Sequence, residues 1–178
     1  MLRNIEIKAR IDSVESLMGK SAAIAHQGPV EIDQDDTFFH CGAGRLKLRA
    51  FSEEAGELIF YRRTDQPEPK ESFYMRSPTS SPGTLRETLT LAYGLAGRVR
   101  KHRTLFIVGR TRIHLDRVVD LGHFLELEVV LDDCEPAELG MREARDLLAR
   151  LGVQSSQLIA EAYVDLAGAG IRSGSPVR

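Results

Sequence analysis

Apolar and polar residues alternate with a period of two along most of this chain, which is the pattern of half-buried β-strands. In the opening segment Ile5, Ile7, Ala9 and Ile11 fall on one face, and polar or charged residues fall on the other. The same alternation predicts strands over Leu2–Ile11, Val30–Phe39, Arg45–Phe51, Glu57–Arg63, Glu71–Arg76, Val99–Val108, Thr111–Val119 and Phe124–Leu131. Strands therefore dominate the predicted fold.

Helical signals are fewer. Asp12 or Ser13 can cap a helix that runs to about Ala25, and Pro82 can occupy the first turn of a helix that ends at Tyr93. A third helix is predicted over 135–151, where apolar residues recur at near-helical spacing before Gly152. Strands in excess of helices predict an α+β protein with a mainly antiparallel sheet.

Proline and glycine mark the connections and the end of the chain. Thr64–Pro69 and Ser77–Gly83 read as turns within one domain that spans residues 1–167. The segment Gly168–Arg178 is rich in Gly and Ser and has little apolar content, so we expect it to be a disordered tail.

The polar faces of the predicted strands carry almost only full charges. GRLKLR places Arg45, Lys47 and Arg49 on one face, whereas FLELEVV groups Glu126 with Glu128. One interpretation is an open sheet whose polar face meets water. The presence of cationic strands beside acidic ones favours another, in which the sheet curls until these faces line one cavity.

The number of cations on these faces suggests what the cavity holds. The cationic positions are Lys8, Arg10, Arg45, Lys47, Arg49, Arg63, Lys101, Arg103 and Arg112, and the acidic ones are Glu6, Asp116, Glu126 and Glu128. Because the cations outnumber the carboxylates, we expect a polyanionic ligand. Arg pairs with phosphate oxygens in two-point geometry, and converging carboxylates bind Mg²⁺ or Mn²⁺. A triphosphate with its metal satisfies both halves of the pattern.

Composition narrows the setting. The 178 residues include 24 Lys+Arg and 26 Asp+Glu, so the chain lacks the uniformly basic surface of a protein that coats nucleic acid. It has neither a membrane-spanning apolar run nor a signal-peptide core at its N-terminus, and its two cysteines are far apart. We therefore expect a cytoplasmic protein that binds neither nucleic acid nor membrane; a homodimer is compatible with the sequence.

Five segments together resemble the CYTH family, which groups class IV adenylyl cyclases with thiamine triphosphatases and related triphosphatases. They are NIEIKAR, GRLKLR, YRRTD, AYVDL and the long VRKHRTLFIVGRTRIHLDRVVDLGHFLELEVVL. The resemblance runs from about Leu2 to Leu166, nearly the whole chain, and the long segment is its most specific part. It implies a closed tunnel of eight antiparallel strands with helices packed outside.

The resemblance also implies roles for the charged residues. The residues that would contact phosphate are Lys8, Lys47, Arg49, Arg63, Lys101 and Arg103, with Arg45 and Arg112 as less strongly implied members of the set. Glu6, Asp116, Glu126 and Glu128 would hold Mg²⁺ or Mn²⁺, and Glu6, Lys8 and Asp116 would take part in catalysis. One position departs from the family motif ExExK: its first acidic residue is Asn4 here. His114, between Arg112 and Asp116, suits either substrate contact or a structural hydrogen bond.

Three functions fit this set. The first choice is a class IV adenylyl cyclase-like reaction, in which the ribose 3′-hydroxyl of ATP attacks the α-phosphorus to give cyclic AMP and pyrophosphate. The alternative is a triphosphatase, in which water attacks a terminal phosphorus of tripolyphosphate, thiamine triphosphate or a nucleotide. The third is a non-catalytic polyphosphate or nucleotide binder, which the loss of a carboxylate at Asn4 suggests.

Overall fold

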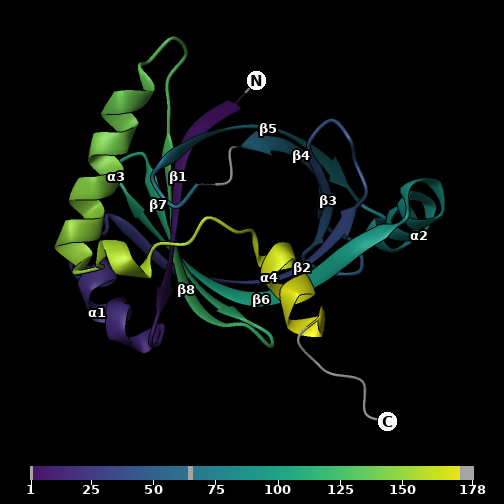
Figure 1. Cartoon of the computed structure of the whole chain (residues 1–178), viewed down its shortest axis with the longest axis horizontal. Helices are drawn as coiled ribbons and strands as arrows, with labels where there is room; N and C mark the ends of the chain where they lie inside the picture. The colour runs from purple at the N-terminus through teal and green to yellow at the C-terminus, as the bar shows by residue number, and fades with distance from the viewer. Residues whose placement is uncertain (1, 64–65, 173–178) are drawn as a thin grey trace.

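The computed structural model describes residues 2–63 and 66–172, and its central feature is a closed β-barrel (Figure 1). Within these residues the strands are β1 (Leu2–Ile11), β2 (Gln27–Phe39), β3 (Arg45–Ala50), β4 (Gly56–Arg63), β5 (Lys70–Thr79), β6 (Leu95–Val108), β7 (Thr111–Val118) and β8 (Gly122–Val130). They follow one another around the barrel in the order β1-β5-β4-β3-β2-β6-β7-β8, and β8 pairs with β1 to close it. Every neighbouring pair is antiparallel.

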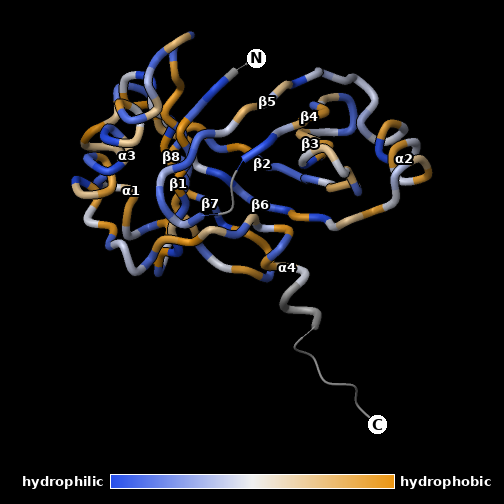
Figure 2. The backbone as a smooth tube through the Cα atoms, turned by 45° about the horizontal axis from the view of Figure 1, so that its top comes forward, coloured by the Kyte–Doolittle hydropathy of each residue, from blue (hydrophilic) through white to orange (hydrophobic). Residues whose placement is uncertain are grey.

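Closure decides what happens to the charged faces. Hydrophilic and hydrophobic residues alternate along the strands (Figure 2). Because successive side chains of a strand point to opposite faces, one set faces the helices outside and the other set faces into the barrel. Ile5 and Ile7 of β1 belong to the outer core, whereas Lys8 is buried on the inner side. The predicted α+β fold with a closed antiparallel tunnel is confirmed, and the open-sheet interpretation is wrong.

Helices cover the outside of the barrel on two sides. α3 (Ala137–Leu151) packs against β1 and β8, and α1 (Glu15–Ile24) lies beside it against β6 and β7 (Figure 1). α2 (Pro82–Tyr93) packs against β2 and β3. Leu147 and Leu151 of α3 join the largest apolar core. Gly140 allows α3 to approach closely, because a Cβ there would come within 2.7 Å of Ile5 and Leu131. None of the helices in the described part of the chain is long and apolar enough to cross a membrane.

The element boundaries differ from the sequence predictions at several points. β2 and β6 begin earlier than predicted, at Gln27 and Leu95, because inter-strand pairing extends over residues whose alternation is weak. β5 continues through Ser77–Thr79, which the sequence predicts as a turn, because these residues pair with β4. α1 begins at Glu15 and α3 at Ala137, two to three residues inside the predicted starts.

A further helix, α4 (Tyr163–Arg172), follows the 3₁₀ turn Ser155–Gln157 and is absent from the sequence prediction. It packs against β6. Residues 168–172, expected to begin a disordered tail, are therefore helical, and residues 173–178 of that tail lie outside the described part of the chain. The sequence gives little signal for α4, because the C-terminal segment has few apolar residues. The helix packs through those at its start, Tyr163, Val164 and Leu166.

Candidate active site

The barrel encloses a cavity of about 320 Å³. Of the residues predicted for the site, the structure brings the following to its wall: Glu6, Lys8, Lys47, Arg49, Arg63, Lys101, Arg103, Arg112, Glu126 and Glu128. They meet there because each occupies an inward position of its strand, and the strands are neighbours around a closed ring. Arg45 and Asp116 are on the same strand faces but are not part of this wall.

Asp116 lies behind the cavity wall and binds cations that line it. Its side chain is fully buried. Arg103 donates from Nε and Nη2 to the two carboxylate oxygens at 2.7 Å each, and Lys101 Nζ is 3.0 Å from Oδ2. The hydroxyl of Tyr163 also donates to Oδ2, at 3.0 Å. These contacts occupy both oxygens of Asp116, which holds Arg103 and Lys101 in place from behind the cavity wall.

Asp36 on β2 does the same for a second pair of cations. Arg49 donates to its two oxygens at 2.7 Å each, and Lys47 Nζ donates at 2.8 Å. Burial raises the pKa of Asp36, but the charges of Arg49 and Lys47 outweigh burial and hold the pKa well below its usual value. Sequence reasoning missed this residue. Its signal was the alternation in IDQDDTFF, which places Asp36 on one face with Gln34 and Phe38.

The remaining carboxylates also contact cations from other strands. Arg63 donates to Glu6 at 2.6 Å, and Arg112 donates to Glu128 at 3.2 Å. Glu126 is 3.4 Å from Lys8 Nζ. Burial raises the pKa of Glu126, but Lys8, a hydrogen bond from His114 and Arg103 hold it well below the usual value, so Glu126 is an anion at neutral pH.

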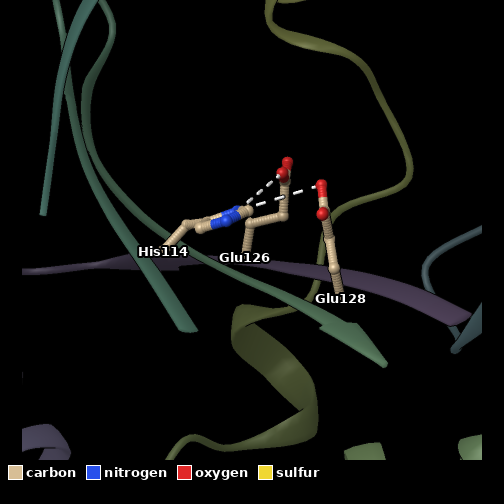
Figure 3. Close-up of side chains that lie close together, drawn as sticks. All are labelled: His114, Glu126 and Glu128. Atoms are coloured by element: carbon tan, nitrogen blue, oxygen red, sulfur yellow. Dashed lines mark hydrogen bonds and ion pairs between the residues drawn. The ribbon is translucent and has the colours of Figure 1, made fainter. Parts of the chain in front are cut away.

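Glu126 and Glu128 form a group of possible metal ligands with His114. One ligand atom from each of the three residues lies within 4.8 Å of the others. Figure 3 shows the imidazole of His114, from β7, directed at the two carboxylates of β8, with Nδ1 3.3 Å from Glu126 Oε1 and 3.9 Å from Glu128 Oε1. Burial and the nearby charge of Arg103 lower the pKa of His114, so the ring is neutral and able to ligate a cation.

Of the four predicted metal ligands, two therefore meet in this group. Glu6 lies beside it, because its backbone pairs directly with that of Glu128, although its carboxylate binds Arg63. Two carboxylates with one imidazole suit a divalent ion such as Mn²⁺, and carboxylates alone would suit Mg²⁺. The donor set thus fits the implied metal, with His114 as an addition that sequence reasoning left undecided.

Two buried amides in the cavity wall have a side-chain oxygen without a hydrogen-bond partner within residues 2–63 and 66–172. They are Asn4, whose Oδ1 is unpaired and which is 4% exposed, and Gln34, whose Oε1 is unpaired and which is 6% exposed. Buried polar groups in folded proteins are almost always paired. Both amides are therefore available to a ligand in the cavity.

Crowding of like charges also prepares the cavity for an anion. Burial, followed by the charge of Arg103, lowers the pKa of Lys101 to about 8. The pKa of Lys47 is lowered in the same way, by burial and then by Arg49. An anion placed between these side chains would favour their charged forms.

Tyr163, the first residue of helix α4, lines the cavity. The Tyr163 ring packs on Phe124, with 4.9 Å between ring centroids, and Lys8 Nζ lies 4.1 Å from the Tyr163 ring centroid. Arg45 faces this helix instead of the cavity, since its Nη1 is 2.8 Å from Asp165 Oδ2. Arg45, predicted as a lesser phosphate contact, thus contacts α4 and is not among the residues that line the cavity.

With this geometry established, comparison with known proteins identifies the family. Residues 2–163 match the CYTH domain. The chain belongs to the CYTH family. A curated CYTH relative, the adenylate cyclase CyaB of Aeromonas hydrophila, is 25% identical over 170 residues, which cover 89% of this chain and 85% of the relative.

Solved structures share the fold of this CYTH protein. The PH1012 protein of Pyrococcus horikoshii OT3 superposes with a TM-score of 0.81 at 22% identity, over 92% of this chain and 98% of that one. HpAC1 of Hippeastrum, for which a dominant triphosphatase activity is described, superposes with a TM-score of 0.64 at 15% identity, over 99% of this chain and 98% of that one.

Proposed function

We propose that this CYTH protein is a divalent-metal-dependent enzyme that holds a triphosphate-bearing substrate inside the barrel. The first-choice reaction is the conversion of ATP to cyclic AMP and pyrophosphate. One observation carries the proposal: among the described residues, eight Lys and Arg side chains but only four carboxylates line the cavity. A triphosphate supplies the missing negative charge and offers oxygens to which Arg and Lys donate strong, charge-assisted hydrogen bonds.

Asp36 and Asp116 determine how the cations present themselves to the substrate. Each carboxylate accepts two hydrogen bonds from one guanidinium and one from an ammonium group. The cations are therefore held in place before the substrate binds. Fixed cations need little reorganisation when charge develops on the non-bridging phosphate oxygens. Asp116 is therefore a positioning residue in this proposal, in place of the catalytic and metal-binding role predicted from the sequence.

Glu126, Glu128 and His114 would hold the metal, with Glu6 and the amide oxygen of Asn4 on the adjacent strand β1. When bound, Mg²⁺ or Mn²⁺ would neutralise phosphate charge and polarise the reacting phosphorus. Lys8, 3.4 Å from Glu126, supplies a cation between this group and the substrate. Arg49, Lys101 and Arg103 would bind phosphate oxygens across the cavity and orient the triphosphate against the metal-binding carboxylates.

The second candidate reaction is hydrolysis of a triphosphate by water. The structural similarity to HpAC1, with its described triphosphatase activity, favours it, while the similarity to the Aeromonas cyclase favours the first. The same cations and carboxylates serve both reactions, because both depend on stabilising charge at phosphorus. A non-catalytic binder is disfavoured, since a polyanion binder gains nothing from Glu126 and Glu128 facing its ligand.

Product analysis tests the proposal. The purified protein is incubated with ATP, tripolyphosphate or thiamine triphosphate, with Mg²⁺ or Mn²⁺, and all products are resolved by chromatography. Cyclic AMP with pyrophosphate supports the cyclase, and orthophosphate supports the triphosphatase. Binding of triphosphate without any product supports the non-catalytic binder. Failure to bind any of the three compounds would overturn the proposal as a whole.

A further inference from the structure

Gln34 carries a buried side-chain amide whose oxygen accepts no hydrogen bond from the described part of the protein. It lies on the inner face of β2, with its backbone paired to that of Lys101 on β6. Its side chain lines the cavity and is 6% exposed, and its Oε1 has no hydrogen-bond partner anywhere in the described residues. Leaving a buried acceptor unpaired is unfavourable, and no described residue offsets this with a hydrogen bond to Oε1. A ligand that donates to Oε1 would.

The surroundings of Gln34 suit an organic ring better than a phosphate. Ile32, Phe51 and Leu105 line the same cavity and add apolar surface to it from β2, from the residue after β3 and from β6. Phe51 follows directly after β3 and is 39% exposed, so its ring is accessible from outside the barrel. Gln34, Phe51 and Lys101 also border a groove of about 1060 Å³, which places them at an edge of the tunnel.

This edge is continuous with the proposed phosphate-binding cations. Phe51 is two residues from Arg49, and Gln34 pairs with Lys101 and is two residues from Asp36. A substrate whose triphosphate contacts Arg49 and Lys101 would therefore carry its organic group past Gln34 and Phe51. The other unpaired amide, Asn4, pairs with Ser72 and Val130 near the metal-binding carboxylates, so it is not placed for this task.

We infer that Gln34 determines which organic group the triphosphate carries. The amide recognises a heteroaromatic ring that presents an amino donor beside a ring-nitrogen acceptor: Oε1 accepts from the amino group, and Nε2 donates to the ring nitrogen, as Gln does with adenine. Phe51 stacks on the ring. Adenine of ATP and the aminopyrimidine of thiamine triphosphate both present this edge. The inference rests on the proposed function, because it takes the triphosphate to occupy the cationic wall.

The test compares ligands with and without the ring. ATP, inosine triphosphate, thiamine triphosphate and tripolyphosphate are titrated calorimetrically into the wild type and Gln34→Met, with EDTA present so that no metal-dependent turnover interferes. Met matches Gln in length but offers no amide. We expect Gln34→Met to weaken the binding of ATP or of thiamine triphosphate about tenfold relative to the binding of tripolyphosphate, which corresponds to about 1.4 kcal/mol. In the wild type, inosine triphosphate, which lacks the amino group, should bind more weakly than ATP.

Arg49→Met is the matched control. This variant removes a proposed phosphate contact, so it should weaken the binding of all four ligands to a similar extent. Gln34→Met should also raise the melting temperature of the ligand-free protein, by about 2–4 °C, because it removes an unpaired buried acceptor. A fall in melting temperature would mean that Gln34 is structural and would overturn the inference.

The remaining outcomes separate the inference from the proposed function. If the wild type binds tripolyphosphate neither in EDTA nor in the presence of Mg²⁺, the proposed function is wrong. If it binds tripolyphosphate but Gln34→Met changes all ligands equally, or none, the role of Gln34 is wrong and the proposed function stands. A loss confined to ATP, or one confined to thiamine triphosphate, supports the inference and identifies which of the two rings is read.

Discussion

Arg103 forms a bidentate ion pair with Asp116 in the wall of the barrel: Nε and Nη2 each donate to a carboxylate oxygen at 2.7 Å. Asp116 has no exposed surface. Arg103 Nη2 also lies 3.2 Å from Glu126 Oε1. One guanidinium therefore connects a carboxylate behind the wall with a carboxylate of the candidate metal group. The pair fixes Arg103 in place while leaving it on the cavity surface, where a phosphate oxygen can reach it.

Replacing Asp116 should cost stability more than metal affinity. Asp116→Asn leaves Arg103 and Lys101 buried beside a neutral amide, and breaking a buried ion pair by removing one partner typically costs about 3–5 kcal/mol. We expect urea denaturation to show a loss of this size, and tripolyphosphate to raise the melting temperature of the variant more than that of the wild type. Asp165→Asn, which affects the partly exposed pair with Arg45, should lose less than about 1 kcal/mol. Unchanged stability with lost metal binding would instead make Asp116 a ligand.

Glu128→Gln should have the opposite profile. The amide retains the volume of the side chain but loses the charge that attracts a divalent ion, and the side chain of Glu128 is 19% exposed, so the protein tolerates the change. We expect Mn²⁺ affinity, measured by titration calorimetry, to fall at least about tenfold and activity to fall with it, while the melting temperature changes little. Glu31→Gln on the outside of the barrel is the control. Activity within threefold of the wild type at saturating metal would remove Glu128 from the metal site.

At Asn4 we predict a substitution that strengthens metal binding. Its buried Oδ1, which has no partner in the described part of the chain, can coordinate a cation but adds no negative charge. Asn4→Glu should therefore lower the metal concentration needed for half-maximal rate, and Asn4→Ala should reduce activity only modestly. Loss of Glu6 should be far more severe, since Glu6 would be the acidic ligand on that strand. A metal titration that Asn4→Glu leaves unmoved would show that this position does not face the ion.

The lowered pKa of Lys101 predicts how binding depends on pH. Burial and the charge of Arg103 place this pKa at about 8, so the free protein loses the proton of Lys101 as pH rises through that value. A polyanion binds the protonated form and raises the pKa, so affinity should fall above pH 8. We expect tripolyphosphate to bind up to about tenfold more weakly at pH 9 than at pH 7 because of this one group.

Lys101→Arg separates this effect from the ionisation of the ligand. Arginine stays charged throughout this range, so the variant should show only the change that tripolyphosphate itself contributes. Calorimetry in buffers of different ionisation enthalpy should detect proton uptake near pH 8 in the wild type and less in the variant. Equal proton uptake by the two proteins would exclude Lys101 as the titrating group.

The alternation of charged and apolar positions was enough to predict the strands, the antiparallel α+β class and most of the residues that line the cavity. This works because the period of a strand is fixed at two, so Lys8, Lys47 or Arg103 must share a face with its neighbours at i±2 whatever the rest of the chain does. The resemblance to a family then supplied the closed tunnel. Neither source gave the helix α4, whose position depends on its packing against β6, where its residue Tyr163 joins an apolar cluster with Val99.

Only the tertiary structure decided which charges meet. The number of cations alone predicts repulsion among Arg49, Arg103 and their neighbours, but Asp36 and Asp116 each neutralise a guanidinium and an ammonium from adjacent strands. The same closure brings His114 to Glu126 and Glu128, and leaves Gln34 buried without a partner among the described residues. A sequence determines which face of its strand a residue occupies; which strands become neighbours, and therefore which side chains come within a few ångströms, depends on how the sheet closes.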